Sequence, residues 1–445
     1  MQNGRTAPIS TAYAHSIRLA WEDPSLIMQN LPGFRDFYPD DCARRNYILS
    51  VWREVARRYG FVEYDGPVLE SIELYEKKSG GELLGQLFDF TDKGGRHIAM
   101  RPEMTPTLAR MVAAREKDFK KPLKWFCCPQ FFRYEKQQRG RLREFYQFNA
   151  DIIGESSVAA DVELICLAID LFRAFGFTEN DFLVRICDRS MWVEFFLRNG
   201  GSDLRSIEFL QVIDKIERED AASLEAKLKV FGISLPQIKE FMAEPLKGEG
   251  VKRTFNELER RGFDKFVEAD AAIVRGLAYY TGLVFEIFDR NKNERALAGG
   301  GRYDNLLSIM SDGKVNLPAL GFGMGDVVLA NLINDTPHAR AKMEDWIARK
   351  HAANIFVVIA KEERRPEAEV IVQQLRDAGR RVDFPLSALR LRKQFEAAEY
   401  VGAELTILVG EEWPQVKVKV LATRDEHVIP HTELADWLRN RQKVV

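Results

Sequence analysis

The strongest constraint on the fold is the pattern of residues 353–445, where short apolar stretches alternate with amphipathic ones. The stretch "NIFVVIA" has the β-branched composition of a buried strand, and "PEAEVIVQQLRDAG" after it has the spacing of an amphipathic helix. The alternation continues through "RRVDF", "LRKQFEAAEYVG", "ELTILVG", "VKVKVLAT" and "TELADWLRN". Strands that alternate with helices usually lie parallel, because each helix crosses over between two strands. We therefore predict a small α/β domain with a largely parallel sheet.

Residues 28–335 follow a different pattern, in which hairpins and helices are mixed. The segment from Asp40 to Tyr59 has a helical apolar stripe, and "QLFDFTDKGGRHIAM" has the pattern of two strands joined by a Gly-Gly turn. Thr105-Pro106 predicts the start of another helix, with the threonine as its cap. Residues from about 195 to 266 are highly charged and mostly helical in pattern. The stretch as a whole predicts an antiparallel α+β domain with a helical insertion.

Composition excludes some classes of protein. The chain has 445 residues, of which 46% are hydrophobic and 30% charged, and this balance is typical of soluble globular domains. No apolar run approaches the ~18 residues that a membrane span needs, and we find no secretory signal pattern. Residues 1–27 are unpatterned, so we expect a disordered extension there. Residues 336–352 are polar, and we expect them to link the two domains.

The cysteines and histidines do not indicate a metal site. The five cysteines form no CxxC pair, and the six histidines have no ligand-like spacing. We therefore expect no disulfide and no structural zinc, as is typical of a reducing, cytoplasmic setting. The formal net charge is -2, so any contact with nucleic acid must come from local basic patches.

The stretch from Phe132 to Asp151, "FRYEKQQRGRLREFYQFNAD", predicts two strands that flank a basic loop. With a period of two, Gln147, Asn149 and Asp151 share one face of the second strand, and the opposite face is apolar. The guanidinium groups of the loop are suited to bind phosphate oxygens in pairs. Composition alone favours the simpler interpretation, a solvated surface hairpin with a charged loop.

Three shorter motifs each permit two interpretations. In "RPEMTPTLAR", Glu103 and Thr105 either cap a helix or present a carboxylate and a hydroxyl to an amine. "ALAGGGRYDNLL" is either a hairpin turn or a place where the backbone approaches a ligand closely. In "PALGFGMGDVVLANLI", alternating glycines leave one strand face without side chains. That face suits either a flat ligand such as a purine or tight packing against another backbone.

The stretch "VRGLAYYTGLVFEIF" has the composition of a buried strand, but polar residues and glycines interrupt it. Arg275 stands near its head, and Tyr279 and Tyr280 follow side by side. Residue types alone permit a core strand with an isolated arginine.

Together these stretches resemble the class II aminoacyl-tRNA synthetases, and specifically the histidyl-tRNA synthetase family. The histidine-specific motif of that family is usually Arg-Gly-Leu-Asp-Tyr-Tyr-Thr-Gly, and "RGLAYYTG" is similar to it. Other family elements resemble "GFRDFYP", "RPEMTPTLAR", "FRYEKQQRGRLREFYQF", "GGGRYD" and "GFGMG". "LRKQFEAAEYVGAELTILVG" is similar to the family's anticodon-binding domain, and the resemblance runs from about residue 30 to the C-terminus.

The resemblance implies a fold, a reaction and partners. Residues 28–335 would be a class II catalytic domain, and residues 353–445 an α/β anticodon-binding domain. The reaction would join L-histidine to tRNA(His) through a histidyl-adenylate, with ATP and Mg²⁺, releasing diphosphate and AMP. The protein would be a cytoplasmic homodimer, with Asp40 to Pro67 at the interface and no membrane contact.

The resemblance also assigns roles to individual residues. Arg275 and Arg133 would be catalytic, since both would contact the α-phosphate of ATP. Asp151 stands where the family usually has glutamate. The histidine-binding residues would be Glu103, Thr105, Gln147, Asp151, Tyr279, Tyr280 and Tyr303. The ATP-binding residues would be Arg133, Glu135, Arg141, Arg275 and Gly323.

Two departures from the family pattern leave alternatives open. Ala278 replaces the usual aspartate, and Val328 stands where the class has an arginine on the γ-phosphate. Another cation would have to serve, and Arg141 is the first candidate. The missing arginine favours a non-catalytic histidine-binding paralogue, such as the regulatory subunit of ATP phosphoribosyltransferase. Arg275 and the complete C-terminal domain oppose that alternative, and the paired tyrosines argue against a threonyl-, prolyl- or glycyl-tRNA synthetase.

Overall fold

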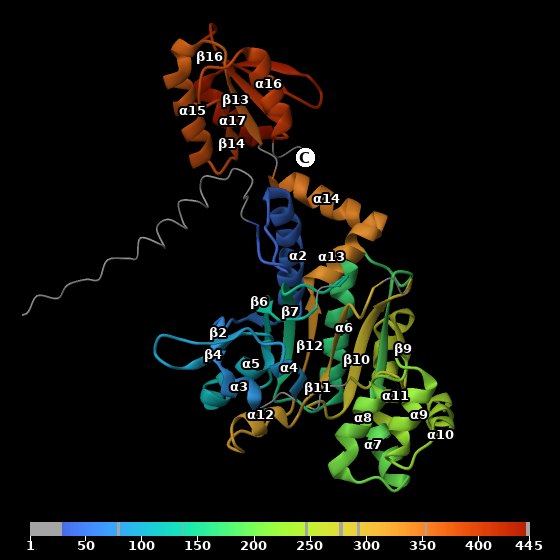
Figure 1. The fold of residues 1–445 in the computed structure, drawn as a ribbon. Helices are drawn as coiled ribbons and strands as arrows, with labels where there is room; N and C mark the ends of the chain where they lie inside the picture. Colours follow the sequence, from blue (N-terminus) through green and yellow to red (C-terminus); the bar gives the residue numbers. More distant parts are fainter. Residues whose placement is uncertain are drawn as a thin grey trace, which may run out of the picture. The chain divides into compact units, whose positions relative to one another are not determined.

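The structure is a computed structural model that divides the chain into two compact units, one ending at Thr336 and one beginning at Pro337 (Figure 1). The extension expected at residues 1–27 lies outside the described residues. Ala278 lies outside them as well. The structure describes residues 29–77, 81–136, 138–244, 248–275, 279–291, 294–351 and 354–441.

The centre of the first unit is a nine-stranded sheet within the described part of the chain. Its strand order is β1-β5-β7-β12-β11-β10-β8-β9, and β6 pairs with β7 beside this path. The inner pairs are antiparallel, and only the edge pairs β1–β5 and β8–β9 are parallel. The antiparallel α+β prediction is therefore confirmed. The strands are β1 (Val62–Glu63), β5 (Leu123–Cys127), β6 (Gln130–Phe132), β7 (Glu144–Ile153), β8 (Phe182–Asp188), β9 (Val267–Ala269), β10 (Leu283–Asp289), β11 (Ala298–Arg302) and β12 (Ala319–Gly325).

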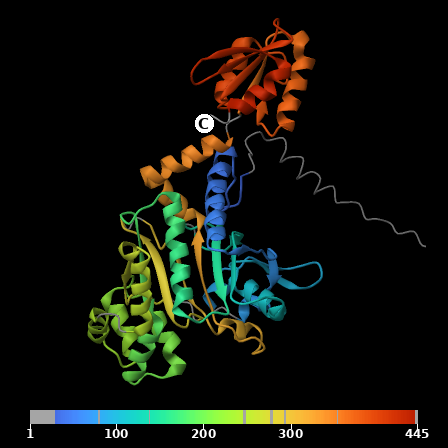
Figure 2. The same ribbon diagram turned by 180° about the vertical axis from the view of Figure 1, so that it is seen from behind.

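Two long helices cover one face of this sheet, α2 (Pro39–Arg58) and α6 (Val158–Phe175), and they contact each other (Figure 2). Trp52 of α2 is fully buried against Phe148 of β7, with ring centroids 6.0 Å apart. Phe148 also lies 5.6 Å from Phe322 of β12. Because side chains alternate along a strand, the opposite face of β7 carries the polar set that contains Asp151.

A smaller antiparallel sheet, β2 (Leu69–Ser71), β4 (His97–Met100) and β3 (Asp89–Thr91), precedes α5 (Thr105–Ala114). The Gly-Gly turn was predicted between the last two strands, and the structure has it there. The predicted cap of α5 is wrong by one residue, because Thr105 is already helical and Met104 is the N-cap. Thr105 is therefore not needed as a cap. Short helices nearby are α3 (Ile72–Glu76), α4 (Gly81–Leu84) and α12 (Leu306–Met310), and α13 (Asp326–Asp335) follows β12.

Helices fill the chain between β8 and β9, with a core rich in aromatic residues. Phe196 and Phe209 stack with ring centroids 4.5 Å apart. Trp192 is fully buried and donates a hydrogen bond to the carbonyl of Ala271, 2.8 Å away. This bond ties the inserted helices to the segment that leads to Arg275. The helices are α7 (Arg189–Arg198), α8 (Ser206–Ile213), α9 (Ala221–Lys229), α10 (Leu235–Ala243) and α11 (Glu249–Arg260).

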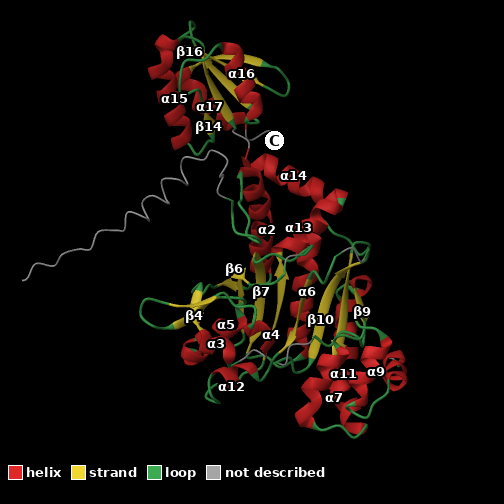
Figure 3. Ribbon diagram, viewed as in Figure 1, coloured by secondary structure: helices red, strands yellow, loops and turns green. Residues whose placement is uncertain are grey.

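The second unit is a five-stranded sheet with helices on both faces (Figure 3). Its strand order is β14-β13-β15-β16-β17, in which β13 is parallel to both neighbours and the last two pairs are antiparallel. The prediction of a largely parallel sheet is therefore only half right, because the link between β15 and β16 is too short for a crossover helix. The strands are β13 (Ile355–Ile359), β14 (Val382–Asp383), β15 (Leu405–Val409), β16 (Gln415–Val420) and β17 (Glu426–Pro430), and the helices are α15 (Arg365–Asp377), α16 (Leu391–Tyr400) and α17 (Leu434–Arg441).

The segment expected as a linker is a helix, α14 (Pro337–His351). Its sequence contains good helix formers such as alanine, lysine, arginine and glutamate, no glycine, and a proline only at its first position. Polar composition indicates solvent exposure and is compatible with a helix. None of the described helices is both long enough and apolar enough to span a membrane.

Candidate active site

Glycines of two neighbouring strands make room for the polar side chains of β7. Gly321 pairs with Asp151 across the β12–β7 ladder. A Cβ atom on Gly321 would overlap the carboxylate of Asp151, and one on Gly323 would lie 2.9 Å from Nε2 of Gln147. The alternating glycines therefore create the space that the side chains of Gln147 and Asp151 occupy. The bare strand face, which from the sequence suited either a flat ligand or another backbone, is thus partly covered by these polar side chains.

We call the bare surface formed by Gly299, Gly321 and Gly323 the glycine floor. Tyr303 and Asp151 form a buried pair beside it. The phenol of Tyr303 donates a hydrogen bond to Oδ1 of Asp151, and both residues are buried. Burial, together with the charge of Asp151, raises the pKa of Tyr303 well above its usual value. The phenol therefore stays protonated and remains a hydrogen-bond donor at any physiological pH.

Three tyrosine rings meet at this pair. The ring of Tyr279 lies 4.7 Å from that of Tyr280 and 6.1 Å from that of Tyr303, the latter at 87°. Burial raises the pKa of Tyr279 well above its usual value, and the carboxylate of Glu103 adds to the shift. The influence of Glu103 shows that its carboxylate acts on the same cluster.

Arg275 lies at the edge of the glycine floor and has a counter-ion that the sequence did not reveal. Its Nη1 donates to Oε1 of Glu286 at 2.9 Å, and a Cβ atom on Gly299 would overlap its guanidinium. Burial acts to lower the pKa of Arg275, but Tyr280 and Glu286 outweigh it and raise the pKa, so the group stays charged. Arg275 has a φ of 52° and is not part of a strand. The isolated-arginine interpretation is therefore wrong.

The ladder of β10 explains why Glu286 was missed. Glu286 pairs directly with Gly299 of β11 and thereby reaches the guanidinium that lies over that glycine. A glutamate inside the apolar run "LVFEIF" was the available signal. Its partner could not be named without the register between the two strands.

A second polar link holds Tyr303 and the tyrosine segment together. The backbone N–H of Asp304 donates to the hydroxyl of Thr281 at 3.1 Å, and Oδ1 of Asp304 accepts from the N–H of Ala319 at 3.1 Å. Neither Asp304 nor Thr281 was assigned a role from the sequence. Their contacts join β11, β12 and the segment that follows Tyr280.

The basic hairpin contains two kinds of arginine. Nη1 of Arg141 lies 2.9 Å from Oε2 of Glu135, and Nη1 of Arg133 lies 3.9 Å from Oε1 of the same carboxylate. The other two arginines are held elsewhere: Arg143 stacks on Tyr134 at 4.1 Å, and Arg139 pairs with Glu294 and Asp335. Arg133 and Arg141 thus both lie beside the carboxylate of Glu135, whereas Arg139 and Arg143 have other partners.

The structure thus brings most of the assigned residues to one face of the sheet. Arg133 also donates through Nε to the carbonyl of Pro102, next to Glu103, at 2.9 Å. Thr105 stands at the start of α5, two residues after Glu103. Among the described residues, no three histidine, cysteine or acidic side chains are grouped as a metal site would require.

An antiparallel sheet with an arginine-bearing hairpin and a glycine floor, joined to a separate α/β unit, defines a class II aminoacyl-tRNA synthetase. The family model described as "Histidyl-tRNA synthetase" matches residues 33–325, and the one described as "Anticodon binding domain" matches residues 354–441. The chain belongs to the histidyl-tRNA synthetase family.

Individual proteins agree with this assignment. "Histidine--tRNA ligase" of Opitutus terrae is 42% identical over 437 residues, covering 93% of this chain and 98% of that protein. The crystal structure of histidyl-tRNA synthetase from Nostoc sp. PCC 7120 has a TM-score of 0.71 at 22% identity, covering 94% of this chain and 100% of that one. A structure named as an ATP phosphoribosyltransferase regulatory subunit/histidyl-tRNA synthetase, from Bacillus halodurans, has a TM-score of 0.67 at 23% identity, covering 84% and 97%. At such identities the structural likeness establishes the fold alone.

Proposed function

We propose that the protein joins L-histidine to tRNA(His) in two steps, through a histidyl-adenylate. The observation that carries the proposal is the buried Asp151–Tyr303 pair, whose carboxylate lies over Gly321 of β12, while the charged guanidinium of Arg275 lies over Gly299 of the neighbouring strand β11. A carboxylate can accept a hydrogen bond from an imidazole N–H, and a cation can bind the phosphates of ATP.

The first step forms the bond between a carboxylate oxygen of histidine and the α-phosphorus of ATP. The bond from that phosphorus to the bridging oxygen breaks, and diphosphate leaves with the electron pair. No proton moves, so the protein contributes orientation and stabilisation of charge. Arg275 and Arg133 supply the positive charge, and Glu135 and Gly323 hold the adenine end. Mg²⁺ accompanies ATP as the counter-ion of its phosphates.

Selection of histidine follows from the polar pocket. Gln147 and Asp151 bind the substrate, Tyr279, Tyr280 and Tyr303 enclose its ring, and Glu103 and Thr105 hold its α-ammonium. Side chains that are buried to pair with imidazole nitrogens would be left unpaired by an apolar analogue, so such analogues are rejected strongly.

The test is histidine-dependent exchange of pyrophosphate into ATP, followed by charging of tRNA(His), in the purified protein. Exchange with histidine and with no other amino acid is expected. Arg275→Ala should lower the exchange rate at least about 100-fold, since it removes a preorganised charge from the transition state. Its circular dichroism spectrum should match that of the wild type, although its unfolding temperature should fall because Glu286 loses its counter-ion. Exchange with threonine or proline instead, or unaltered exchange by Arg275→Ala, would refute the assignment.

The second candidate is the non-catalytic histidine-binding paralogue, and one observation favours it: Val328 stands where the class has its arginine. Arg275 with its counter-ion and the complete second unit oppose it. Such a protein would bind histidine without any exchange, so the same assay distinguishes the two candidates.

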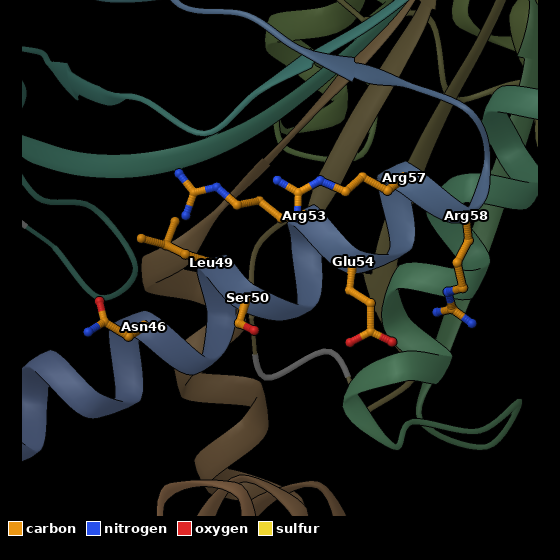
Figure 4. Close-up of a pocket in the computed structure, with 7 residues that line it drawn as sticks. All are labelled: Asn46, Leu49, Ser50, Arg53, Glu54, Arg57 and Arg58. Atoms are coloured by element: carbon orange, nitrogen blue, oxygen red, sulfur yellow. The ribbon is translucent and has the colours of Figure 1, made fainter. Parts of the chain in front are cut away.

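We also propose a cytoplasmic homodimer that meets at the edge of the sheet. Strand β1 ends the strand order of the large sheet, and its Val62 is 63% exposed. A hollow runs along the exposed side of α2 next to it (Figure 4). Val62→Asp should shift the sedimentation coefficient to that of a monomer, and Val230→Asp, at a position 65% exposed in the insertion, should not. The hollow is lined by Asn46, Leu49, Ser50, Arg53, Glu54, Arg57 and Arg58.

A further inference from the structure

The first turn of α13 lacks a cation where a triphosphate would need one. Val328 lies there with only 7% of its surface exposed. Its Cγ2 lies 3.3 Å from the position that a Cβ atom on Gly140 would occupy. Gly140 is next to Arg141, so Val328 borders the tip of the basic hairpin. A valine cannot bind a phosphate, and the site therefore needs charge from elsewhere.

Arg295 borders the same point from a different part of the chain. It lies in the connection between β10 and β11, and its Cδ is 3.6 Å from the Cβ position of Gly140. The side chains of Arg295 and Val328 are therefore neighbours on either side of the hairpin tip. Val328 thus occupies the position of the missing arginine, and Arg295, from a distant part of the sequence, brings a guanidinium next to it.

The surroundings of Arg295 are positive. Although Arg295 stays exposed to solvent, the protein around it partly desolvates its guanidinium and lowers its pKa. The charges of Arg141, Arg133 and Arg218 lower that pKa further, against an opposing effect from Glu135. Like charges repel, so a cluster of this kind is stabilised when an anion lies among its members. A polyphosphate is the anion that suits several guanidinium groups at once.

Arg295 is available for such a ligand. It remains accessible to solvent, and within the described part of the chain it makes no hydrogen bond or ion pair. Its neighbour Arg139 differs, because Oε1 of Glu294 and Oδ2 of Asp335 accept from it at 2.7 and 3.1 Å. The adjacent carboxylate is thus already used by Arg139, and the guanidinium of Arg295 is left for a ligand.

We propose that Arg295 binds the β- and γ-phosphates of ATP and thereby replaces the arginine that Val328 lacks. This inference rests on the proposed function and deepens it. When the Pα–O bond breaks, the negative charge collects on the diphosphate, and the guanidinium stabilises the leaving group. Arg141 then need not act alone, as the sequence had suggested.

The test compares Arg295→Ala and Arg295→Lys with wild type in the full-length protein. Titration calorimetry measures binding of ATP, of inorganic diphosphate and of AMP, and pyrophosphate exchange gives the KM for ATP. Arg295→Ala should weaken ATP and diphosphate binding about 10- to 100-fold, the usual effect of losing a charge-assisted hydrogen bond. AMP binding should not change, and lysine should recover part of the loss. Arg139→Ala, a cation of the same hairpin that is already paired, should change ATP binding less than about 3-fold.

The results separate the inference from the function that it rests on. If wild type shows no histidine-dependent exchange, the proposed function fails, whereas altered diphosphate binding by Arg295→Ala would still support the phosphate site. If wild type exchanges and Arg295→Ala binds ATP and diphosphate normally, the inference is refuted. An equal loss of AMP and ATP binding would also refute it, because the residue would then act on the nucleoside or on the fold.

Discussion

At the scale of single residues, the pair of Tyr303 and Asp151 sets the character of the pocket. Because the phenol stays protonated, one carboxylate oxygen is permanently occupied by it. That oxygen, Oδ1, lies over Gly321, so the hydrogen bond fixes the orientation of the carboxylate above the glycine. A shorter carboxylate than the family's usual glutamate is thus fixed by a neighbour that keeps it from turning.

Tyr303→Phe tests this positioning. The variant keeps the ring and removes only the hydroxyl, so we expect the KM for histidine to rise about 10-fold, the effect of one lost hydrogen bond to a charged group. The KM for ATP should change little. Pyrophosphate exchange measures both constants, and a KM for histidine equal to that of the wild type in a normally folded variant would contradict the role of the hydroxyl.

Sequence patterns identified residues better when they belonged to a continuous motif than when they came together across strands. Asp151, Tyr303 and Arg275 each stand in a recognisable stretch, and the structure brings them to one site. Glu286 and Arg295 do not stand in such a stretch. Their neighbours depend on the register of β10 with β11 and on the path of a loop. Such contacts are properties of the folded chain, and no local pattern of residues contains them.

At the scale of elements, β11 shows how two adjacent glycines can serve different purposes. A Cβ atom on Gly300 would overlap the backbone oxygen of Gly321 and the backbone of Phe322, neither of which can move freely. A Cβ atom on Gly299 would meet the end of the Arg275 side chain, which is flexible. The first glycine is needed by the sheet, and the second by the site.

Substitution of the two glycines should therefore have different effects. Gly300→Ala should lower the free energy of unfolding by about 2 kcal/mol or more, as overpacking does in a close-packed interior. Gly299→Ala should cost less stability than Gly300→Ala and should reduce pyrophosphate exchange, because it displaces Arg275 from Glu286. Denaturant unfolding and exchange assays on both variants check this, and equal losses of stability would count against the distinction.

A second prediction at this scale concerns Asp326, at the start of α13, and the effect of pH on stability. Burial raises the pKa of Asp326 to about 6, although the charge of Arg35 opposes the shift. The folded state then binds this proton more tightly than the unfolded chain, whose value is 3.8. The contribution of Asp326 to the free energy of unfolding should therefore fall as pH rises from about 4 to about 6. Urea unfolding of wild type and Asp326→Asn from pH 4 to 8 measures the difference in their free energies of unfolding. That difference should fall with pH up to about 6 and stay constant at higher pH. A difference that grows with pH would contradict the assignment.

At the scale of the whole molecule, the two units have separate cores. The core of the second unit includes Val357, Ile407 and Val418, all fully buried, and none of its cluster members comes from the first unit. The change of sequence pattern predicted two domains, because each pattern reflects a different way of burying apolar surface. It did not predict the helix α14 or the antiparallel edge strand β17, which is only five residues long and mostly exposed.

Removal of residues 337–445 should separate the two steps of the reaction. We expect the shortened chain to keep histidine-dependent pyrophosphate exchange within about 10-fold of the full-length rate, since every assigned site residue lies in the first unit. Charging of tRNA(His) should fall by a much larger factor, because the unit matched to an anticodon-binding domain is gone. Loss of exchange together with charging, in a chain that still unfolds cooperatively, would contradict this division.

The alternation along β7 and β12 has a consequence for reading genetic variation. On both strands the odd-numbered positions, from Gln147 to Asp151 and from Gly321 to Gly325, lie on the side of the pocket, and the even-numbered positions between them are buried in the core. A change at an odd position should leave an abundant but inactive protein, and a change at an even one a scarce protein. On these two strands, an odd or even residue number therefore predicts whether a substitution reduces activity or reduces the amount of folded protein.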